Sequence, residues 1–211
     1  MQTKTQTNAS VNASCKLAYL LLVSALFVSA LCSFTANARD FYIDRSGDFT
    51  SNKDVIKSIL LDYPSYGQKP QHKYHLSGID EMRIVKKVDE NHFYTWTYVH
   101  DSRTYKYFNY VTIKEGEDGK IVVRSTFPNS DSVATLQRET GLPHFAFFDY
   151  TNVSWTISDK KDAQGNVIGT HVRYVGNFSA SGFAATLGAR IINSNLQSTA
   201  TEMFAVLGEQ I

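Results

Sequence analysis

The residues most able to do chemistry lie in one predicted β-hairpin, which spans residues 145–178. Asp149 is predicted on the same face as Trp155, because side chains two apart along a strand point the same way. His171 and Arg173 share one face of the next strand. A carboxylate and a base in a sheltered site could polarise a carbonyl group or move a proton, since burial shifts pKa values. The alternative is that Asp149 and Arg173 form a cross-strand ion pair or face water.

The sequence has no pattern typical of a metal site or of covalent catalysis. Its six histidines include no H-E-x-x-H motif, and Cys15 and Cys32 are its only cysteines. A G-x-S-x-G nucleophile motif is absent, and Gly165 and Gly169 belong to a hairpin rather than a phosphate-binding loop. We therefore expect no metal and no cofactor.

Aromatic side chains are concentrated in two consecutive predicted strands, at residues 92–100 and 104–114. Tyrosine and tryptophan offer a large apolar area together with one hydrogen-bonding group, which suits the lining of a cavity. They are also common in ordinary strands. The pattern favours ligand lining, with a plain sheet core as the alternative. The aromatic candidates in these strands are Tyr94, Trp96, Tyr98 and Tyr107.

Residues 1–38 are predicted to form a signal peptide. Residues 1–16 contain two lysines and no acidic residue, and an apolar run at Leu17–Phe34 follows them. Ala36-Asn37-Ala38 then matches the small-x-small cleavage pattern. An uncleaved anchor is the alternative, because the run could just span a bilayer. We expect cleavage after Ala38 and export to a periplasm or to the medium.

Charge and composition exclude some classes of function for residues 39–211. Of the 21 basic side chains, Lys4 and Lys16 fall before residue 39, which leaves 19 against 20 acidic ones and a net charge of −1. A near-neutral chain argues against nucleic acid as a partner. No basic amphipathic helix supports contact with a membrane. The length suffices for one domain that is stable without disulfides, and we expect a monomer.

The spacing of apolar residues predicts an α+β chain whose central part is mostly β-strand. Asp54–Asp62 has helical spacing and precedes Pro64, and residues 132–140 are weakly helical. Strands are predicted at residues 39–45, within 75–88, and at 92–100, 104–114, 120–127, 145–158 and 167–178.

A long C-terminal helix is predicted from Gly182 to Ile211, with Ser179 or Ser181 as its N-cap. Leu187 and Ile191 lie on its wide apolar stripe. The opposite side, predicted to face water, carries Arg190, Asn193, Gln197 and Thr201. Only this helix is long enough to cover an antiparallel sheet that has one apolar face.

Two segments carry a resemblance to a known superfamily. VIKSILLDYPSYGQ at 55–68 and the run from Trp155 to Gly188, with its HVRYVGNF and SGFAATLG stretches, resemble helix-grip domains. These are the START, polyketide-cyclase (SRPBCC) and birch-pollen-allergen proteins. The resemblance implies a curved antiparallel β-sheet wrapped around a long C-terminal α-helix. It also implies an internal cavity that holds a hydrophobic ligand.

We therefore expect residues 39–211 to be an exported START-like helix-grip domain that binds a hydrophobic or lipid-like small molecule. Binding is favoured over catalysis. The alternatives are a cyclase or lyase that uses Asp149, His171 or Arg173, and an interaction module whose cavity is filled by its own side chains. The expected ligand-binding residues are Tyr94, Trp96, Tyr98, Tyr107, Asp149, Trp155, His171, Arg173, Leu187 and Ile191.

Overall fold

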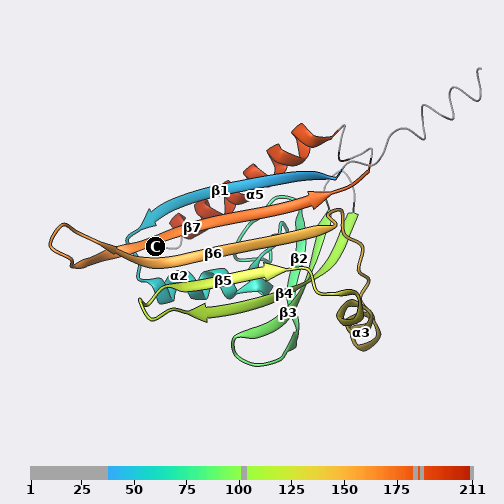
Figure 1. Cartoon of the computed structure of the whole chain (residues 1–211), viewed down its shortest axis with the longest axis horizontal. Coiled ribbons are helices and arrows are strands. Elements are labelled where there is room, and N and C mark those ends of the chain that lie inside the picture. Colours follow the sequence, from blue (N-terminus) through green and yellow to red (C-terminus); the bar gives the residue numbers. More distant parts are fainter. Residues whose placement is uncertain (1–37, 101–103, 183–184, 186–187, 210–211) are drawn as a thin grey trace, which may run out of the picture. The chain divides into compact units, whose positions relative to one another are not determined.

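A computed structural model describes residues 38–100, 104–182, 185 and 188–209 of the chain. In the described part, strands dominate as far as Ala180 and a long helix follows them (Figure 1). The elements are β1 (Arg39–Phe49), α2 (Lys53–Leu61), η1 (Tyr63–Ser65), β2 (Ile79–Lys87), β3 (His92–His100), β4 (Thr104–Glu115), β5 (Ile121–Thr126), α3 (Ser130–Thr140), β6 (Tyr150–Lys161), β7 (Val167–Ala180) and α5 (Ala189–Glu209).

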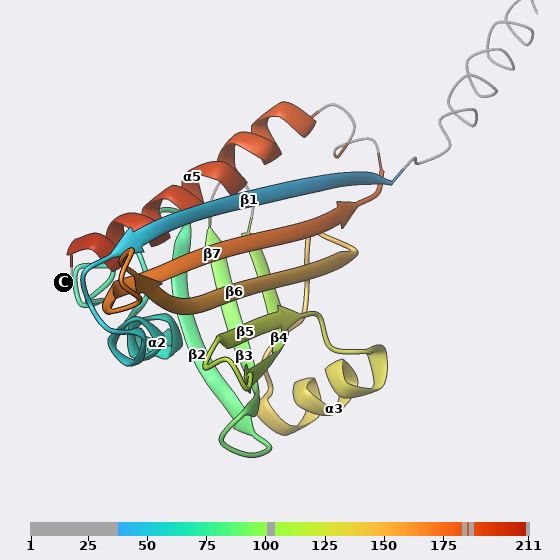
Figure 2. The same cartoon turned by 60° about the vertical axis from the view of Figure 1, so that its left-hand side comes forward.

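The strands form one antiparallel sheet of seven in the order β1-β7-β6-β5-β4-β3-β2. Each strand from β2 to β7 pairs with its sequence neighbour, and β1 joins the far edge by pairing with β7. The sheet is strongly bent, so that β2, β3 and β4 run steeply across the direction of β1, β7 and β6 (Figure 2). Its concave face is the one that α5 covers.

The two short helices have clear start and stop signals. The Asn52 side chain caps α2 by accepting a hydrogen bond from Val55 N at 3.0 Å, and Asn129 caps α3 in the same way. α3 ends at Gly141, whose φ of 69° is in the left-handed region that glycine occupies without a steric penalty. α2 buries Ile56 and Leu60 and lies inside the bend of the sheet.

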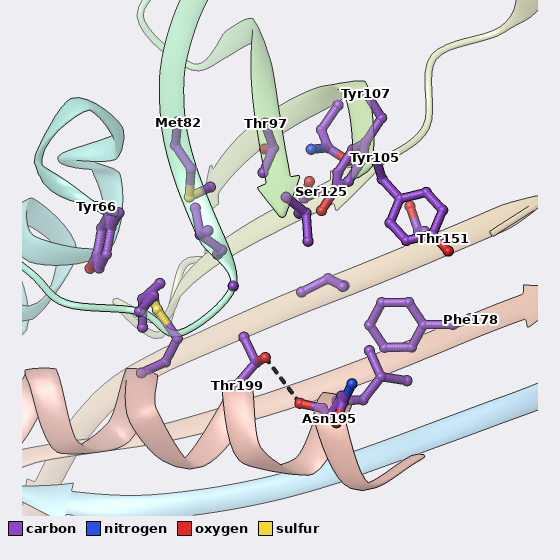
Figure 3. A pocket seen from close by; sticks show the side chains of 18 of the residues that line it. Tyr66, Met82, Thr97, Tyr105, Tyr107, Ser125, Thr151, Phe178, Asn195 and Thr199 are labelled. Atoms are coloured by element: carbon purple, nitrogen blue, oxygen red, sulfur yellow. Dashed lines mark hydrogen bonds between the residues drawn. The ribbon is translucent and has the colours of Figure 1, made fainter. Parts of the chain in front are cut away.

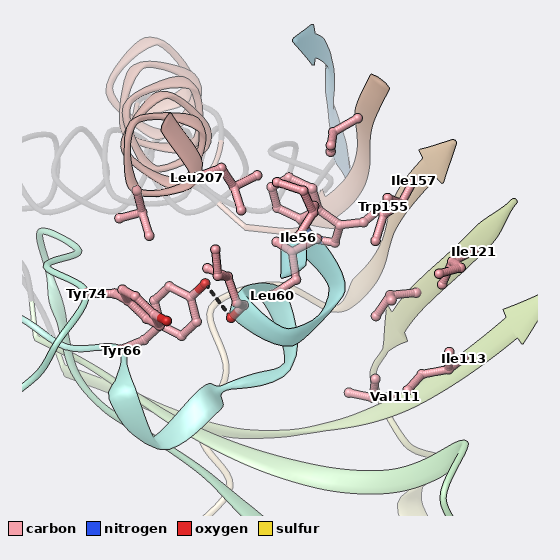
Figure 4. Packing of buried hydrophobic residues seen from close by; sticks show 14 of the residues in the cluster. Ile56, Leu60, Tyr66, Tyr74, Val111, Ile113, Ile121, Trp155, Ile157 and Leu207 are labelled. Carbon is pink, nitrogen blue, oxygen red and sulfur yellow. Dashed lines mark hydrogen bonds between the residues drawn. The ribbon is translucent and has the colours of Figure 1, made fainter. Parts of the chain in front are cut away.

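Two apolar clusters hold α5 against the sheet, one at its last turns and one along its first half. The larger one packs Val206 and Leu207 of α5 against α2, η1 and the strands (Figure 4). There the hydroxyl of Tyr66 donates to the carbonyl oxygen of Ile59 at 2.9 Å. The second cluster joins the earlier turns of α5 to β1 and β7 through Ala200 and Phe178.

α5 also lies close to the edge strand β1, and glycine makes this approach possible. A Cβ atom on Gly47 would be 3.0 Å from the ring of Phe204, so a larger residue would require this ring to shift. The same ring stacks on Phe49 at 6.1 Å, and the Arg45 guanidinium lies 5.6 Å from its centre. Arg45 also donates a hydrogen bond to Thr201 of the helix.

A third cluster lies on the convex face of the sheet, under α3. It consists of Trp96, Phe108 and Leu136, and Tyr94 and Tyr98 pack against it. Helix α3 thus gives the outer face of β3 and β4 its own apolar cover.

The predicted fold class is confirmed: this is an α+β helix-grip architecture with a curved antiparallel sheet and a C-terminal helix. The strand predicted at 92–100 coincides with β3, and the side of the last helix predicted to face water is exposed. Several boundaries differ from the prediction, and β1, predicted to end at residue 45, continues to Phe49. β6 begins at Tyr150 rather than residue 145, because residues 145–149 form an irregular segment.

The described part of the last helix begins at Ala189, later than the predicted start at Gly182. The ladder between β1 and β7 continues until Arg39 pairs with Ala180. Ser179 is therefore extended backbone inside β7 and does not act as a helix cap.

Replacing Leu207 with alanine should destabilise the domain, because this fully buried side chain fixes the end of α5 to the main core. We expect Leu207→Ala to lower the free energy of unfolding by about 2–5 kcal/mol in a urea titration followed by circular dichroism. Val167→Ala is the control, since Val167 is 57% exposed and its truncation should change little. Equal effects of the two substitutions would contradict this account of the core.

Candidate ligand-binding cavity

A cavity of about 500 Å³ lies between the concave face of the sheet and α5. It extends along α5 from Ile191 to Met203 (Figure 3), and members of both clusters, such as Leu196 and Met203, form part of its wall. Its volume falls in the range of about 300–1,000 Å³ that is usual for small-molecule sites.

Most of the cavity wall is apolar, and it draws on nearly every element of the domain. The sheet supplies Val99, Phe127, Val153, Trp155 and Phe178, the segment before β6 supplies Phe147 and Phe148, and α5 supplies Ile192, Leu196 and Met203. A ligand that buries apolar surface here gains about 25 cal/mol for each Å² removed from water.

Uncharged polar side chains cross the sheet side of the cavity in a band that we term the polar stripe. Thr95 and Thr97 lie two residues apart on β3, and Asn109 of β4 is directly opposite Thr95 in the ladder. Ser125 of β5 and Thr151 of β6 continue the band toward β7. Figure 3 shows Thr97, Ser125 and Thr151 on the sheet wall, across from Asn195 and Thr199 of α5.

Three of the tyrosines that line the cavity are kept neutral by burial. Burial raises the pKa of Tyr107 to about 12 and also raises the pKa values of Tyr63 and Tyr174. Among the described lining residues, Glu202 is the one charged side chain. The cavity lining thus offers hydroxyl and amide groups, and none of the described lining residues is a lysine, arginine or histidine.

Glu202 connects α5 to the segment that precedes β2. One carboxylate oxygen accepts the backbone N–H of Ser77 at 2.7 Å, and the other accepts the hydroxyl of Ser198 at 3.4 Å. Ser77 and Glu202 both line the cavity, so this bond closes part of its wall.

Residues 143–148 form an end wall that is fastened to β3 and β4. Trp96 Nε1 donates to the carbonyl of Pro143 at 3.0 Å, and Phe108 N donates to Nδ1 of His144 at 3.1 Å. Phe145 and Lys106 of β4 exchange two backbone hydrogen bonds, at a part of β4 that β5 does not reach. These bonds place the next residues, Phe147 and Phe148, at the cavity.

Comparison with solved structures identifies the fold. The STAR-related lipid transfer protein of Xanthomonas axonopodis matches with a TM-score of 0.56 and 14% identity, over 77% of this chain and 82% of that one. The human StarD13 lipid transfer and protein localization domain matches with a TM-score of 0.51 and 9% identity, over 88% and 95%. The chain has a START-like fold. No protein-family model matches its sequence, and no curated protein is significantly similar to it.

Several predicted site residues of the START-like domain lie at the cavity. Tyr107, Trp155 and Ile191 line it, the last at the rim, where it is 67% exposed. Leu187 lies outside the described residues.

The aromatic residues predicted on β3 are on the opposite face. Trp96 is buried under α3, and Tyr94 and Tyr98 pack beside it, so none of the three lines the cavity. This corrects the expectation that they contact the ligand. Strand alternation sends the other set of residues inward, and that set includes Thr95 and Thr97.

Asp149, His171 and Arg173 do not come together, and none lines the cavity. This corrects the expectation of a sheltered acid–base group. Asp149 is exposed, because the segment before β6 has lost strand alternation: the adjacent residues Phe147 and Phe148 both point to the cavity.

His171 and Arg173 lie on the outer face of β7, where they meet carboxylates of β1. Nδ1 of His171 is 2.7 Å from Asp48, and Arg173 donates two hydrogen bonds to Asp44. The guanidinium lowers the pKa of Asp44 to about 2. These surface pairs stabilise the β1–β7 edge only weakly, since both partners are exposed to solvent.

The polar stripe was not predicted as part of the site, although the sequence contains its signal. On β3 the threonines and aromatics alternate, so choosing which face points inward decides whether Thr95 and Thr97 or Trp96 and Tyr98 meet the cavity. The described residues hold no group of three His, Cys, Asp or Glu side chains arranged for a metal ion. No described helix is both long and apolar enough to cross a membrane.

Acidification should weaken the end wall through His144. Burial lowers the pKa of His144 from 6.5, and its Nδ1 accepts a backbone hydrogen bond that only the neutral ring can accept. The unfolded state then binds the proton at higher pH than the folded state. The stabilising contribution of neutral His144 is therefore present above pH 6.5 and lost as the pH falls through the lower pKa of the folded state.

We expect the free energy of unfolding to fall more steeply between pH 7 and pH 5 in the unmodified protein than in His144→Gln. Thermal unfolding monitored across this range measures the difference. His75→Gln, which changes an exposed histidine, should keep the original pH dependence. A His144→Gln profile parallel to that of the unmodified protein would rule out this role of His144.

Proposed function

We propose that this START-like domain binds a hydrophobic or lipid-like small molecule in the cavity and shields it from water. The observation that carries the proposal is the cavity of about 500 Å³ with mainly apolar walls and a few uncharged polar groups. The structural similarity to a STAR-related lipid transfer protein also supports the binding of a hydrophobic ligand. Transfer of the bound molecule between membranes or proteins would be a further use of the same cavity.

Binding has more support than the two alternatives. A cyclase or lyase would need reacting groups at the ligand, and Asp149, His171 and Arg173 lie outside the cavity lining. An interaction module with a self-filled cavity is disfavoured by the open volume itself.

The proposal is tested by native mass spectrometry of the protein purified from the cells or medium that produce it. We expect a stoichiometric adduct with the mass of a lipid or similar apolar molecule, which solvent extraction then identifies. We also propose that the domain is exported, so the chain mass should correspond to a start at Arg39. Protein without an adduct, together with no binding from a panel of lipids, would count against a carrier.

A substitution that fills the cavity should abolish binding without unfolding the domain. Val153 lines the cavity from β6, and tryptophan there would occupy ligand space. We expect Val153→Trp to lower the amount of retained ligand at least about 10-fold, which corresponds to a loss of about 1.4 kcal/mol. Arg173→Ala, on the outer face, should retain the ligand, and circular dichroism should show both variants folded. Full ligand retention by folded Val153→Trp would place the ligand elsewhere.

Ligand exchange should depend on the bond between Glu202 and Ser77. This bond ties the middle of α5 to the segment before β2, and entry requires part of the wall to move. We expect Glu202→Ala to release a bound fluorescent fatty alcohol about 3- to 10-fold faster in stopped flow, as expected for losing one solvent-exposed hydrogen bond. Glu209→Ala, at the last residue of the same helix, is the control. An unchanged release rate in Glu202→Ala would mean that the ligand enters through another part of the wall.

A further inference from the structure

Three buried hydroxyl groups on the cavity wall lack hydrogen-bond partners. They belong to Thr95, Thr97 and Thr151, whose side chains are 1%, 1% and 7% exposed. None of the three Oγ1 atoms has a partner among the described residues. All three residues line the cavity as members of the polar stripe.

Buried polar residues away from the cavity have partners. The hydroxyl of Thr170, which is fully buried, donates to the carbonyl oxygen of Ser51, and buried Asp80 accepts a hydrogen bond from Gln68. The other buried side-chain atoms without a hydrogen-bond partner, on His72 and Arg83, belong to partly exposed residues that do not line the cavity, and Arg83 Nε lies 3.2 Å from a carboxylate oxygen of Glu81. Among buried polar residues, the lack of partners is thus confined to the cavity.

This pattern indicates that a ligand completes the hydrogen bonding. A buried hydroxyl without a partner is unfavourable, whereas a threonine hydroxyl can both donate to and accept from an oxygen atom of a ligand. The neighbouring Asn109 and Ser125 widen the set of groups that such an oxygen could meet.

The ligand's polar groups should be uncharged. Among the described lining residues there is no lysine, arginine or histidine to neutralise a carboxylate or phosphate, and Glu202 would repel either one. Burying an unpaired charge is much less favourable than burying a neutral hydroxyl or ester.

The ligand should also carry oxygen at more than one position. Two strands separate β3, which holds Thr95 and Thr97, from β6, which holds Thr151. At about 4.8 Å between neighbouring strands, the two ends of the stripe lie about 14 Å apart along the sheet. One oxygen atom cannot contact both ends.

We propose that the polar stripe recognises an uncharged amphiphile with at least two separated oxygen-bearing groups, of the chemical class of a partial glyceride. The inference rests on the proposed function and adds the ligand class to it. Apolar walls hold the chain of such a molecule, and the threonines contact its hydroxyl or ester oxygens.

The test compares three probes with the same twelve-carbon chain: monododecanoylglycerol, dodecanoate at pH 8, and 1-dodecene. The full chain is incubated with an equal mixture of the three, separated from free lipid, extracted and analysed by gas chromatography–mass spectrometry. We expect the glyceride to be retained at least about 5-fold over each of the other two, since each hydrogen bond is worth a factor of about 2–12.

Substitutions at the stripe should remove this preference. Thr97→Val and Thr151→Val keep the side-chain shape, and each should lower the glyceride to dodecene ratio about 2- to 10-fold. Thr112→Val, a similar change on a β4 residue outside the cavity lining, should leave the ratio unchanged. Thr97→Val should also raise the melting temperature of the ligand-free protein by about 2–4 °C, because it removes a buried hydroxyl without a partner.

The outcomes separate this inference from the proposed function. Retention of all three probes without preference, or a preference for dodecanoate, would overturn the inference and leave hydrophobic binding standing. A lower melting temperature for Thr97→Val would also overturn it, because the hydroxyl would then have a structural role. Retention of none of the probes would overturn both.

Discussion

The structure depends on one helix that is packed along its first half and at its last turns across the concave face of a bent sheet. Val206 and Leu207 fix α5 beside α2, and Ala200 and Phe178 belong to the cluster that joins it to β1 and β7. Beside these clusters the inner face of the sheet presents short side chains such as Thr97, and space remains between them and the helix. The cavity is therefore a consequence of where large and small residues lie along the same inner face, and it persists because both helix contacts are apolar and well packed.

The fold was largely predictable from the sequence because its signals are local. Alternation of apolar side chains indicated the strands, and helical spacing indicated α2 and the last helix. The errors arose where distant segments decide the outcome. β7 continues through Ser179 because it pairs with Arg39–Phe49, a partner more than a hundred residues earlier in the chain. The same pairing provides Asp44 and Asp48 to Arg173 and His171, which keeps those two side chains at the outer surface.

The candidate site was less predictable because both faces of β3 carry bulky or β-branched residues. Aromatic side chains suggested that Tyr94, Trp96 and Tyr98 face a ligand. They face outward because α3, whose sequence is only weakly helical, covers them with Leu136. A single-strand pattern cannot show whether the outer face of a sheet is covered, so the choice of face needed the tertiary structure.

Stability and ligand recognition conflict at the inner face of β3. Valine at Thr95 or Thr97 would fill nearly the same volume and leave no buried hydroxyl without a partner. Buried hydroxyl groups normally have a hydrogen-bond partner, as that of Thr170 does, and the threonines at these two positions are exceptions. Such local violations are expected where a protein meets a ligand, because the missing partner then comes from the bound molecule. The same groups that make the empty cavity less stable would thus determine which apolar molecules it accepts.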